Sequence, residues 1–442
     1  MNIAFEISPL ITASGSFGDK SGVYRYTYGL ISSYAKMLQK KDRNKQIFLF
    51  SFSYDLLKQP LNPELYNLFK KKNVTFLNTF PKIDKDKTVD DEYISNQTIK
   101  FIIRMINKII PFKSIYLKIK DKLRFYNYLR LLDREFKKQN IDIIVHSETC
   151  FYPLNGYKHV ITIYDLTTIY VPEFHRSETI DLQKRKLRFA ADYCEGIICI
   201  SESTKKDLLS YSNSFKSKKI MIGYPGIDPV FKSRSVKTNS YLGALCQVNN
   251  KKVKLEPKKY LLYYGTFEPR KNLFYVVRAF LDLHDSKKIP KDFRLLMIGG
   301  QGWGKVKTGI IEYLKEIYPT EENLPIIVSN YASDNYLKRI IKNAYALVYP
   351  SFYEGFGLPV LETMCLGTPV ICSRNSSLTE VGGEAVLYAN PRDYLNLRYK
   401  ISYLINNPKT VSVMVKKGLV QSKKFSWEET SQQLYGFLQS LL

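Results

Sequence analysis

The sequence is poor in the residues that build metal and disulfide sites. Its 442 residues contain four histidines and six cysteines, and no two cysteines form a Cys-x-x-Cys pair. Most of the cysteines stand beside isoleucine, valine or leucine in runs typical of buried segments, which predicts reduced thiols in a cytosolic compartment. The histidines show no metal-ligand spacing, so no metal site is expected.

Long apolar runs are also absent. No window approaches the ~20 uncharged apolar residues that cross a bilayer. The first ten residues, MNIAFEISPL, have no basic region followed by a long apolar stretch. The sequence therefore predicts neither a secretory signal nor a membrane span, and we expect a cytoplasmic protein.

Acidic residues are scarce relative to basic ones. There are 67 Lys and Arg against 41 Asp and Glu, a formal net charge of +26, while 45% of the residues are hydrophobic and 14% aromatic. The apolar content excludes a disordered polyelectrolyte, and the length predicts two domains with separate cores. The basic surplus favours an anionic partner, which could be nucleic acid, lipid headgroups or a phosphorylated small molecule.

Short apolar runs alternate with amphipathic stretches of helical period along most of the chain. This alternation predicts an α/β fold with parallel sheets covered on both faces. The pattern fades over residues 228–259 and restarts at Tyr260, so we place the interdomain linker there. The predicted strands are 3–7, 47–52, 141–145, 159–163, 196–200, 260–264, 294–298, 326–328, 346–348 and 369–372.

Two segments do not follow this alternation of apolar runs and amphipathic stretches. Residues 81–98 are polar and predict a loop. Residues 100–138 alternate Ile, Leu, Tyr and Phe with many basic residues and few acids, and Pro111 divides them. A basic amphipathic helix of this kind is typical of a membrane-surface segment. The alternative is a solvated helix whose apolar face packs on its own sheet.

The richest motif is Glu354-Gly-Phe-Gly-Leu-Pro-Val-Leu-Glu362. It follows a predicted strand, passes two glycines and starts a helix with Pro359 in its first turn, where a missing N–H costs nothing. A helix N-terminus reached through a glycine-rich turn presents backbone N–H groups to an anion such as phosphate. The two carboxylates better suit hydroxyl groups of a ribose or a sugar, because phosphate repels them.

The Glu-x7-Glu spacing resembles the signature of the retaining GT-B glycosyltransferases of family 4, especially bacterial mannosyl- and rhamnosyltransferase-like enzymes of polysaccharide assembly. The resemblance implies two Rossmann-like domains facing a cleft: an acceptor-binding domain over residues 1–235, with the basic segment as an insertion at about 100–138, and a nucleotide-sugar domain over 255–420. It also implies that residues 421–442 form a helix returning to the N-terminal domain. Phe425-Ser-Trp427-Glu would open that helix.

By the same resemblance, Glu354 contacts the donor hexose and Glu362 the nucleotide ribose. The backbone between them, at Phe356, Gly357 and Leu358, lies near the diphosphate.

A second motif, Tyr264-Gly265-Thr266-Phe-Glu-Pro-Arg270-Lys271-Asn, follows the first strand of the second half. Adjacent Arg and Lys at a strand-to-helix junction suit a diphosphate, and the resemblance assigns both to the donor diphosphate. Many relatives have Arg where this chain has Thr266, and Arg270 is expected to supply that guanidinium. The turn containing Gly300 resembles the family's Ile-Gly-Gly turn on the donor side.

The first half contributes the acceptor side of the predicted cleft. Glycines at Gly15, Gly18 and Gly22 allow a backbone loop to approach a ligand closely. After the strand at 159–163, the resemblance predicts a His-Asp pair, but this chain has Tyr164-Asp165. Tyrosine is a poor base at neutral pH, so Asp165 is the stronger candidate. Ser201 also follows family spacing, with helix capping as the alternative role.

The resemblance implies a retaining transfer that needs no metal or other cofactor, with GDP-mannose favoured over UDP- or dTDP-sugars as the donor. The Asp-x-Asp at Asp84 and Asp86 lacks a preceding apolar strand and is interpreted as a solvated loop. The expected partners are a nucleotide sugar, a lipid-linked or oligosaccharide acceptor in O-antigen or capsule assembly, and an anionic membrane surface, with no specific nucleic acid.

Two alternatives remain open at this stage. One is a basic membrane- or nucleic-acid-binding protein on a degenerate GT-B fold. The other is a GT-B synthase that acts on soluble sugar acceptors.

Overall fold

The computed structural model describes residues 1–12, 22–41, 45–53, 63–77, 113–147, 150–232, 242–319 and 324–442. Several predictions made from the sequence fall outside these ranges: the residues Gly15, Gly18, Asp84 and Asp86, the polar stretch 81–98, and the first part of the basic segment.

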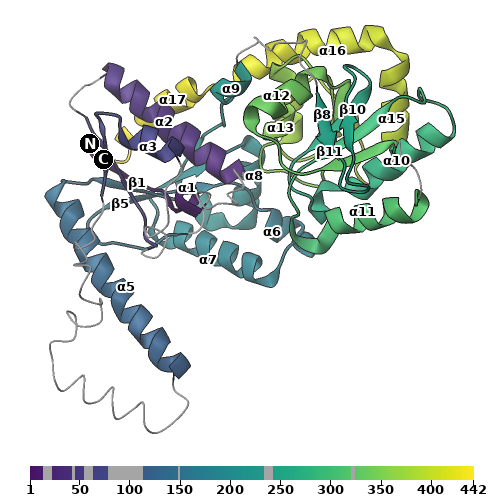
Figure 1. Ribbon diagram of the computed structural model, residues 1–442. Helices are drawn as coiled ribbons and strands as arrows, with labels where there is room; N and C mark the ends of the chain where they lie inside the picture. Colours follow the sequence, from purple (N-terminus) through teal and green to yellow (C-terminus); the bar gives the residue numbers. More distant parts are fainter. Residues whose placement is uncertain are drawn as a thin grey trace.

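The described chain forms two parallel sheets (Figure 1). Each predicted strand is present, because runs of Val, Ile, Leu and Phe buried on both faces are typical of parallel strands between helical layers. Five short strands were not predicted: β3 (Val74–Phe76), β7 (Lys219–Ile222), β8 (Gly243–Leu245), β9 (Lys252–Lys254) and β15 (Leu387–Ala389). In spatial order, the first sheet contains β3 (Val74–Phe76), β2 (Ile47–Phe50), β1 (Ile3–Glu6), β4 (Ile143–His146), β5 (Lys158–Ile163), β6 (Gly196–Cys199) and β7 (Lys219–Ile222).

The second sheet lies in the C-terminal half, with β10 and β13 adjacent at its centre. Both strands are fully buried, and each leads into one of the two motifs singled out above. In spatial order, the sheet contains β12 (Ile326–Ser329), β11 (Arg294–Ile298), β10 (Tyr260–Tyr264), β13 (Ala346–Tyr349), β14 (Val370–Ser373) and β15 (Leu387–Ala389).

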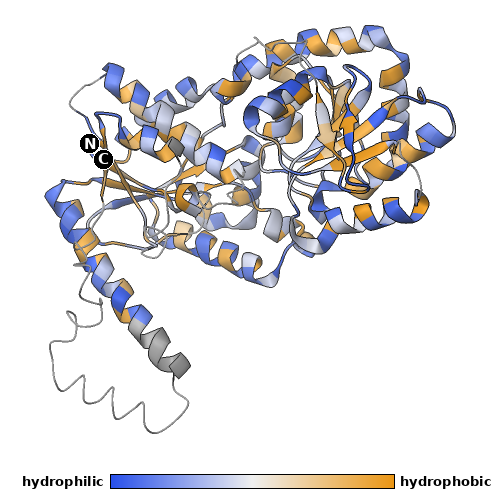
Figure 2. Cartoon of the chain, in the orientation of Figure 1, coloured by the Kyte–Doolittle hydropathy of each residue, from blue (hydrophilic) through white to orange (hydrophobic). Residues whose placement is uncertain are grey.

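The helices alternate with the strands along the chain, and the hydropathy colouring shows apolar strands inside with mixed helices outside (Figure 2). The helices of the first half are α1 (Ser8–Thr12), α2 (Gly22–Lys41), α3 (Pro63–Phe69), α5 (Lys113–Lys138), α6 (Thr167–Tyr170), α7 (Ser177–Tyr193), α8 (Glu202–Tyr211) and α9 (Pro229–Lys232). Those of the second half are α10 (Leu273–Asp285), α11 (Val306–Ile317), α12 (Asp334–Asn343), α13 (Leu358–Cys365), α14 (Leu378–Gly382), α15 (Tyr394–Asn406), α16 (Pro408–Gln421) and α17 (Trp427–Gln439). Within the described ranges, no helix combines the length and the apolar composition needed to cross a bilayer.

The segment predicted to be the linker contains more structure than expected. Besides α9, it holds an antiparallel hairpin of β8 (Gly243–Leu245) and β9 (Lys252–Lys254). The amide of Gln247 donates to the carbonyl of Val328 at the end of β12, so the hairpin packs beside the second sheet. The Ser, Asn and Lys content of the segment concealed these strands, because their lysines remain in solvent.

The structure bears on one of the two interpretations of the basic segment, the one in which α5 packs on its own sheet. Its C-terminal half packs on the first sheet, where Leu132 and Phe136 are fully buried against residues that include Phe50 and Ile144. Its other end projects away from the body of the molecule (Figure 1). The interpretation that the apolar face packs on its own sheet therefore holds for the C-terminal half of α5.

The last helix, α17, packs against α2 of the first domain (Figure 1). Ser426 caps it by accepting a hydrogen bond from the amide of Glu429. Thr430 donates to the carbonyl of Tyr224, and Lys45 donates to the hydroxyl of Tyr435 at 2.8 Å. The helix thus joins the end of the chain to the N-terminal sheet.

Candidate active site

A cavity of about 400 Å³ lies between the two domains and receives residues from both. It sits at the carboxyl ends of the parallel strands, where open α/β sheets bind ligands. From the predicted set, the lining includes Glu354, Asp165, Arg270, Lys271, Glu362, Phe356, Gly357, Leu358, Thr266, Gly265, Gly300, Gly22 and Tyr164. Distant segments of the sequence thus meet at one site.

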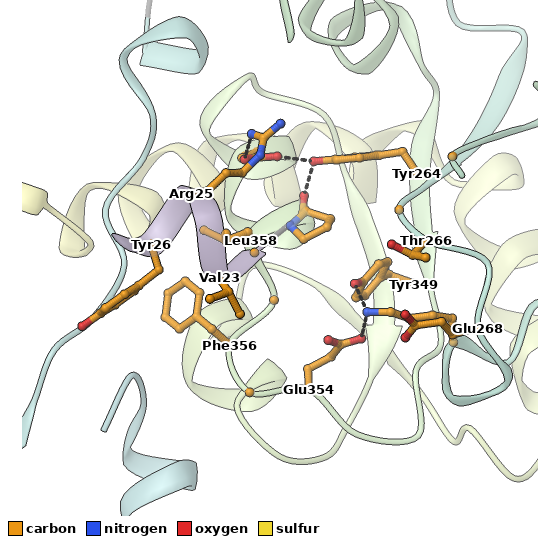
Figure 3. Close-up of a pocket in the computed structure, with 18 of the residues that line it drawn as sticks. Val23, Arg25, Tyr26, Tyr264, Thr266, Glu268, Tyr349, Glu354, Phe356 and Leu358 are labelled. Carbon is orange, nitrogen blue, oxygen red and sulfur yellow. Dashed lines mark hydrogen bonds and ion pairs between the residues drawn. The ribbon is translucent and has the colours of Figure 1, made fainter. Parts of the chain in front are cut away.

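Glu354 lies at one end of the cavity (Figure 3). It contacts two cations, Lys271 and Arg270. Its Oε1 is 2.6 Å from Lys271 Nζ, and its Oε2 is 3.1 Å from a terminal nitrogen of Arg270. Burial alone would raise the pKa of Glu354, but the two cations outweigh burial and lower the pKa to about 2. Glu354 is therefore a carboxylate at neutral pH, able to accept hydrogen bonds but a weak base.

The two cations are themselves bound on several sides. Lys271 Nζ also donates to the hydroxyl of Tyr349 at 2.8 Å, and Arg270 donates to the carbonyl of Tyr353 and approaches Glu268 at 3.4 Å. These bonds fix both side chains on the turn Pro269–Lys271 after β10. Glu354 and Glu268 balance the charges of Arg270 and Lys271, so these four side chains form one connected ion-pair network beside the cavity.

The N-terminus of α13 supplies a second electropositive element. Gly357 precedes the helix with φ of 107°, a left-handed conformation that favours glycine, and Pro359 lies in the first turn. Gly357, Leu358 and Pro359 all line the cavity, so the N-terminus of α13 lies at the site.

Arg25 and Tyr264 lie at the other end of the cavity (Figure 3), and both contact Glu362. The hydroxyl of Tyr264 donates to Oε2 at 3.0 Å, and Arg25 contacts Oε1 at 2.9 Å. Burial raises the pKa of Glu362 to about 7, although Arg25 and Tyr264 both act to lower it. The two glutamates of the motif therefore differ in protonation at neutral pH, which their spacing alone did not indicate.

The first domain closes the cavity with the segment after β5. Asp165 Oδ1 accepts from the amide and the hydroxyl of Thr167 at 3.0 and 2.7 Å, which orders the start of α6. The hydroxyl of Tyr164 lies 3.0 Å from Thr27 Oγ1. A Cβ on Gly355 would lie 2.4 Å from the carbonyl oxygen of Tyr164, so the two domains approach each other closely at this point.

Ser201 was predicted either to face the cleft or to cap a helix. It is fully buried, caps α8 by accepting from the amide of Thr204 at 3.0 Å, and does not line the cavity. Its hydroxyl also lies 2.9 Å from the hydroxyl of Thr204. The structure therefore favours the capping role.

Sequence reasoning missed other cavity residues, of which Arg25 is the most notable. It lies one turn into α2, behind the glycine loop, and no motif distinguishes it from other basic residues of the chain. Tyr264 and Glu268 stand within the second motif and Tyr349 shortly before Glu354, but none of the three was assigned a role. Among the described residues, no cluster of three or more His, Cys, Asp or Glu is placed to hold a metal ion.

Two parallel sheets with a cavity at the carboxyl ends of their strands match the GT-B arrangement expected from the sequence. Comparison with known families agrees. Residues 247–420 match the family described as Glycosyl transferases group 1, and residues 90–231 match Glycosyltransferase Family 4. The O-antigen chain mannosyltransferase B of Escherichia coli is 30% identical over 307 residues, which cover 66% of this chain and 73% of that protein. The chain belongs to glycosyltransferase family 4.

More distant comparisons support the fold. The O-antigen chain mannosyltransferase RfbU of Salmonella typhimurium is 27% identical over 57% of this chain and 62% of its own length. Sucrose-phosphate synthase from Thermosynechococcus elongatus superposes with a TM-score of 0.64 at 18% identity, covering 100% of this chain and 99% of that one. WaaG, a glycosyltransferase involved in lipopolysaccharide biosynthesis, gives 0.58 at 12% identity with 98% of both chains covered.

Proposed function

We propose that this glycosyltransferase moves a hexose, with mannose favoured, from a nucleoside-diphosphate sugar to a growing glycan of a cell-surface polysaccharide, with retention of configuration. The observation that carries the proposal is the cavity between the domains. It joins a charge-paired Glu354, the N-terminus of α13 and Glu362 in one site. The relatives named O-antigen chain mannosyltransferases support mannose as the transferred hexose and an O-antigen glycan as the product. The choice of GDP-mannose as the donor rests on the resemblance of the sequence motifs.

In the proposed reaction, the N–H groups at the start of α13 receive the diphosphate, and Arg270 and Lys271 stabilise the charge that develops on it. Glu354 accepts hydrogen bonds from hydroxyl groups of the donor hexose, and Glu362 accepts them from the ribose. The acceptor hydroxyl attacks the face from which the diphosphate leaves, and a phosphate oxygen takes its proton. Glu354 fits this scheme because a carboxylate with a lowered pKa orients the sugar without removing a proton.

Glu354→Gln tests the assignment. The amide keeps the size of the side chain, whereas Ala would leave a cavity beside two buried cations. We expect kcat for hexose transfer to fall about 100-fold or more, because the loss of a preorganised polar group at a reacting centre has effects of this size. Glu312→Gln on α11, which is exposed, is the matched control. Full transfer activity in Glu354→Gln, with folding verified by circular dichroism, would contradict the proposal.

The donor and the acceptor require separate measurements. A thermal-shift screen with GDP, UDP and dTDP identifies the base, because a ligand that binds only the folded state raises the apparent melting temperature. We expect GDP to give the largest shift. Transfer to lipid-linked sugars but not to free sugars would support polysaccharide assembly, whereas transfer to free sugars would favour a soluble-acceptor synthase.

Attachment to the inner face of an anionic membrane is the second part of the proposal. Along α5, Lys122, Arg124 and Arg130 are exposed. Leu123 and Tyr126 lie beside them, with side chains 60% and 45% exposed. Basic residues interleaved with exposed apolar ones suit anionic headgroups. A lipid-linked acceptor would be held near such a surface.

Vesicles of phosphatidylglycerol and phosphatidylcholine test this attachment. We expect the protein to sediment with them at low salt and to be released as the salt concentration rises, because dissolved ions screen the attraction between the basic side chains and the anionic headgroups. The triple variant Lys122→Gln/Arg124→Gln/Arg130→Gln should lose most of this binding. A matched variant on the exposed face of α7, Lys184→Gln/Arg185→Gln/Arg188→Gln, removes the same charge and should retain it. Equal loss in both variants would mean that net charge alone is responsible.

A further inference from the structure

Arg25 reaches from the first domain into the donor end of the cavity (Figure 3). One terminal nitrogen lies 2.9 Å from Glu362 Oε1 on α13, and the other lies 2.6 Å from Asp334 Oδ1 at the start of α12. The guanidinium also lies 5.5 Å from the ring centre of Phe231. One side chain of α2 thus holds two carboxylates of the opposite domain.

The partners of Glu362 leave it able to receive a ligand. Arg25 contacts one carboxylate oxygen and Tyr264 the other. A carboxylate has about four acceptor positions, so each oxygen retains one for a further hydrogen bond. Two neighbouring hydroxyl groups, as on a ribose, match two such positions.

We propose that Arg25 is a positioning residue for donor binding, which orients the carboxylate of Glu362 from across the cleft and stabilises its charge so that it can bind the ribose hydroxyls of the nucleotide. The inference rests on the proposed donor role of Glu362. It implies that the donor site, although built on the C-terminal domain, is complete only when the N-terminal domain is closed over it.

The shape of the guanidinium group explains why arginine suits this position. Its two terminal nitrogens diverge in a fixed plane and bind Glu362 and Asp334 at the same time, so the direction of the Glu362 carboxylate is set by a rigid fork. A lysine would supply the charge from a single flexible point. Arg25→Lys should therefore recover only part of the function.

Nucleotide titration of the full-length protein tests the role. With the nucleoside diphosphate that wild type binds best, isothermal titration calorimetry should show Kd raised about tenfold or more in Arg25→Gln, the size expected for losing a hydrogen bond to a charged group. Arg25→Lys should give an intermediate Kd. Arg188→Gln, on the exposed face of α7 in the same domain, should leave Kd unchanged. An unchanged or lower Kd in Arg25→Gln would overturn the inference, since a residue that merely blocks the site would give tighter binding when removed.

A double-mutant cycle with Glu362→Gln separates action through Glu362 from a general structural effect. If Arg25 acts through Glu362, Arg25→Gln should add little to the loss already caused by Glu362→Gln. Full additivity would overturn the inference. If Glu362→Gln itself binds nucleotide like wild type, the donor role of Glu362 fails and the inference fails with it. If only Arg25→Gln binds like wild type, the inference alone fails.

The pH dependence of binding gives a second readout. Glu362 faces Arg25 from α2, Tyr264 from β10, Asp334 from α12 and Asp228 before α9. Burial raises its pKa to about 7, Arg25 opposes the rise, and the two aspartates add to it. Nucleotide affinity in wild type should therefore strengthen as pH rises through about 7. Removing the cation raises the pKa of Glu362 further, so the corresponding rise in Arg25→Gln should occur at higher pH. Identical profiles would count against the inference.

Discussion

Glu354 and Glu362 show how two like residues eight positions apart acquire different chemistry. Both are buried, which by itself raises the pKa of a carboxyl group. Two cations within 3.1 Å keep Glu354 ionised, whereas Glu362 has one cation and two nearby aspartates. The sequence motif identifies both carboxylates, but only their neighbours decide which of them titrates near neutral pH.

Gly355 is the residue at which the two domains approach most tightly in this motif. A Cβ there would lie 2.4 Å from the carbonyl oxygen of Tyr164 and 2.9 Å from the Cβ of Asp165. Backbone atoms cannot move aside as the end of a flexible side chain can. Gly355→Ala should therefore force the segments around Gly355 and Tyr164 apart and destabilise the protein by about 1–3 kcal/mol. We expect a lower melting temperature and a lower kcat. Gly436→Ala on α17, where a Cβ would meet nothing within 4 Å, is the control.

At the scale of elements, α17 connects the end of the chain to the first domain. Trp427 lies in the first turn of α17 and packs against two glycines, Gly29 and Gly226. A Cβ on Gly29 of α2 would lie 2.4 Å from the Trp427 ring, and a Cβ on Gly226 would lie 2.3 Å from its amide nitrogen. The indole also meets Tyr26 edge-on, with ring centres 5.5 Å apart.

Trp427→Ala should therefore destabilise the protein by about 3–5 kcal/mol, the range for removing a large buried aromatic side chain. Thermal unfolding followed by circular dichroism measures the change without relying on tryptophan fluorescence. Tyr399→Ala on α15, where the ring is 60% exposed, should change the melting temperature little. Equal shifts in the two variants would show that α17 does not stabilise the fold through Trp427.

At the scale of the whole molecule, contacts between the domains surround the cavity. Glu380 of α14 accepts from the amides of Glu202 and Ser203 at the start of α8, at 2.9 and 3.0 Å. Its carboxylate also accepts from the hydroxyl of Tyr224, and Tyr353 donates to Asp207. These bonds hold the domains in the closed arrangement that places Asp165 near Gly355.

The double variant Glu380→Gln/Tyr353→Phe weakens the hydrogen bonds that both side chains make between the domains. It should therefore shift the population toward an open arrangement. Small-angle X-ray scattering should show a larger radius of gyration, partly reversed by saturating nucleoside diphosphate. Glu384→Gln/Tyr399→Phe changes the same residue types, both highly exposed and away from the domain interface, and should scatter like wild type. An unchanged radius in the first variant would mean that other contacts maintain closure.

Much of the architecture could be predicted from local patterns. Ten buried apolar strands are evident in the sequence because parallel strands are covered on both faces and need continuous apolar runs. The short strands β7 and β15 and the hairpin β8–β9 could not be predicted, because partial exposure allows polar residues in them. Because its residues are partly exposed and polar, the hairpin was interpreted as part of the linker.

The sequence by itself determined the α/β class, the helix start at Leu358 and the family of the chain, because strand burial, helix capping and motif spacing are local properties of neighbouring residues. Only the tertiary structure decided that Arg25 joins Glu362, that Ser201 caps a helix outside the cavity, and that Glu354 balances both cations. Each of these facts depends on distances between residues far apart in the chain. Charge and burial act through space, and the folded arrangement of the two domains sets those distances.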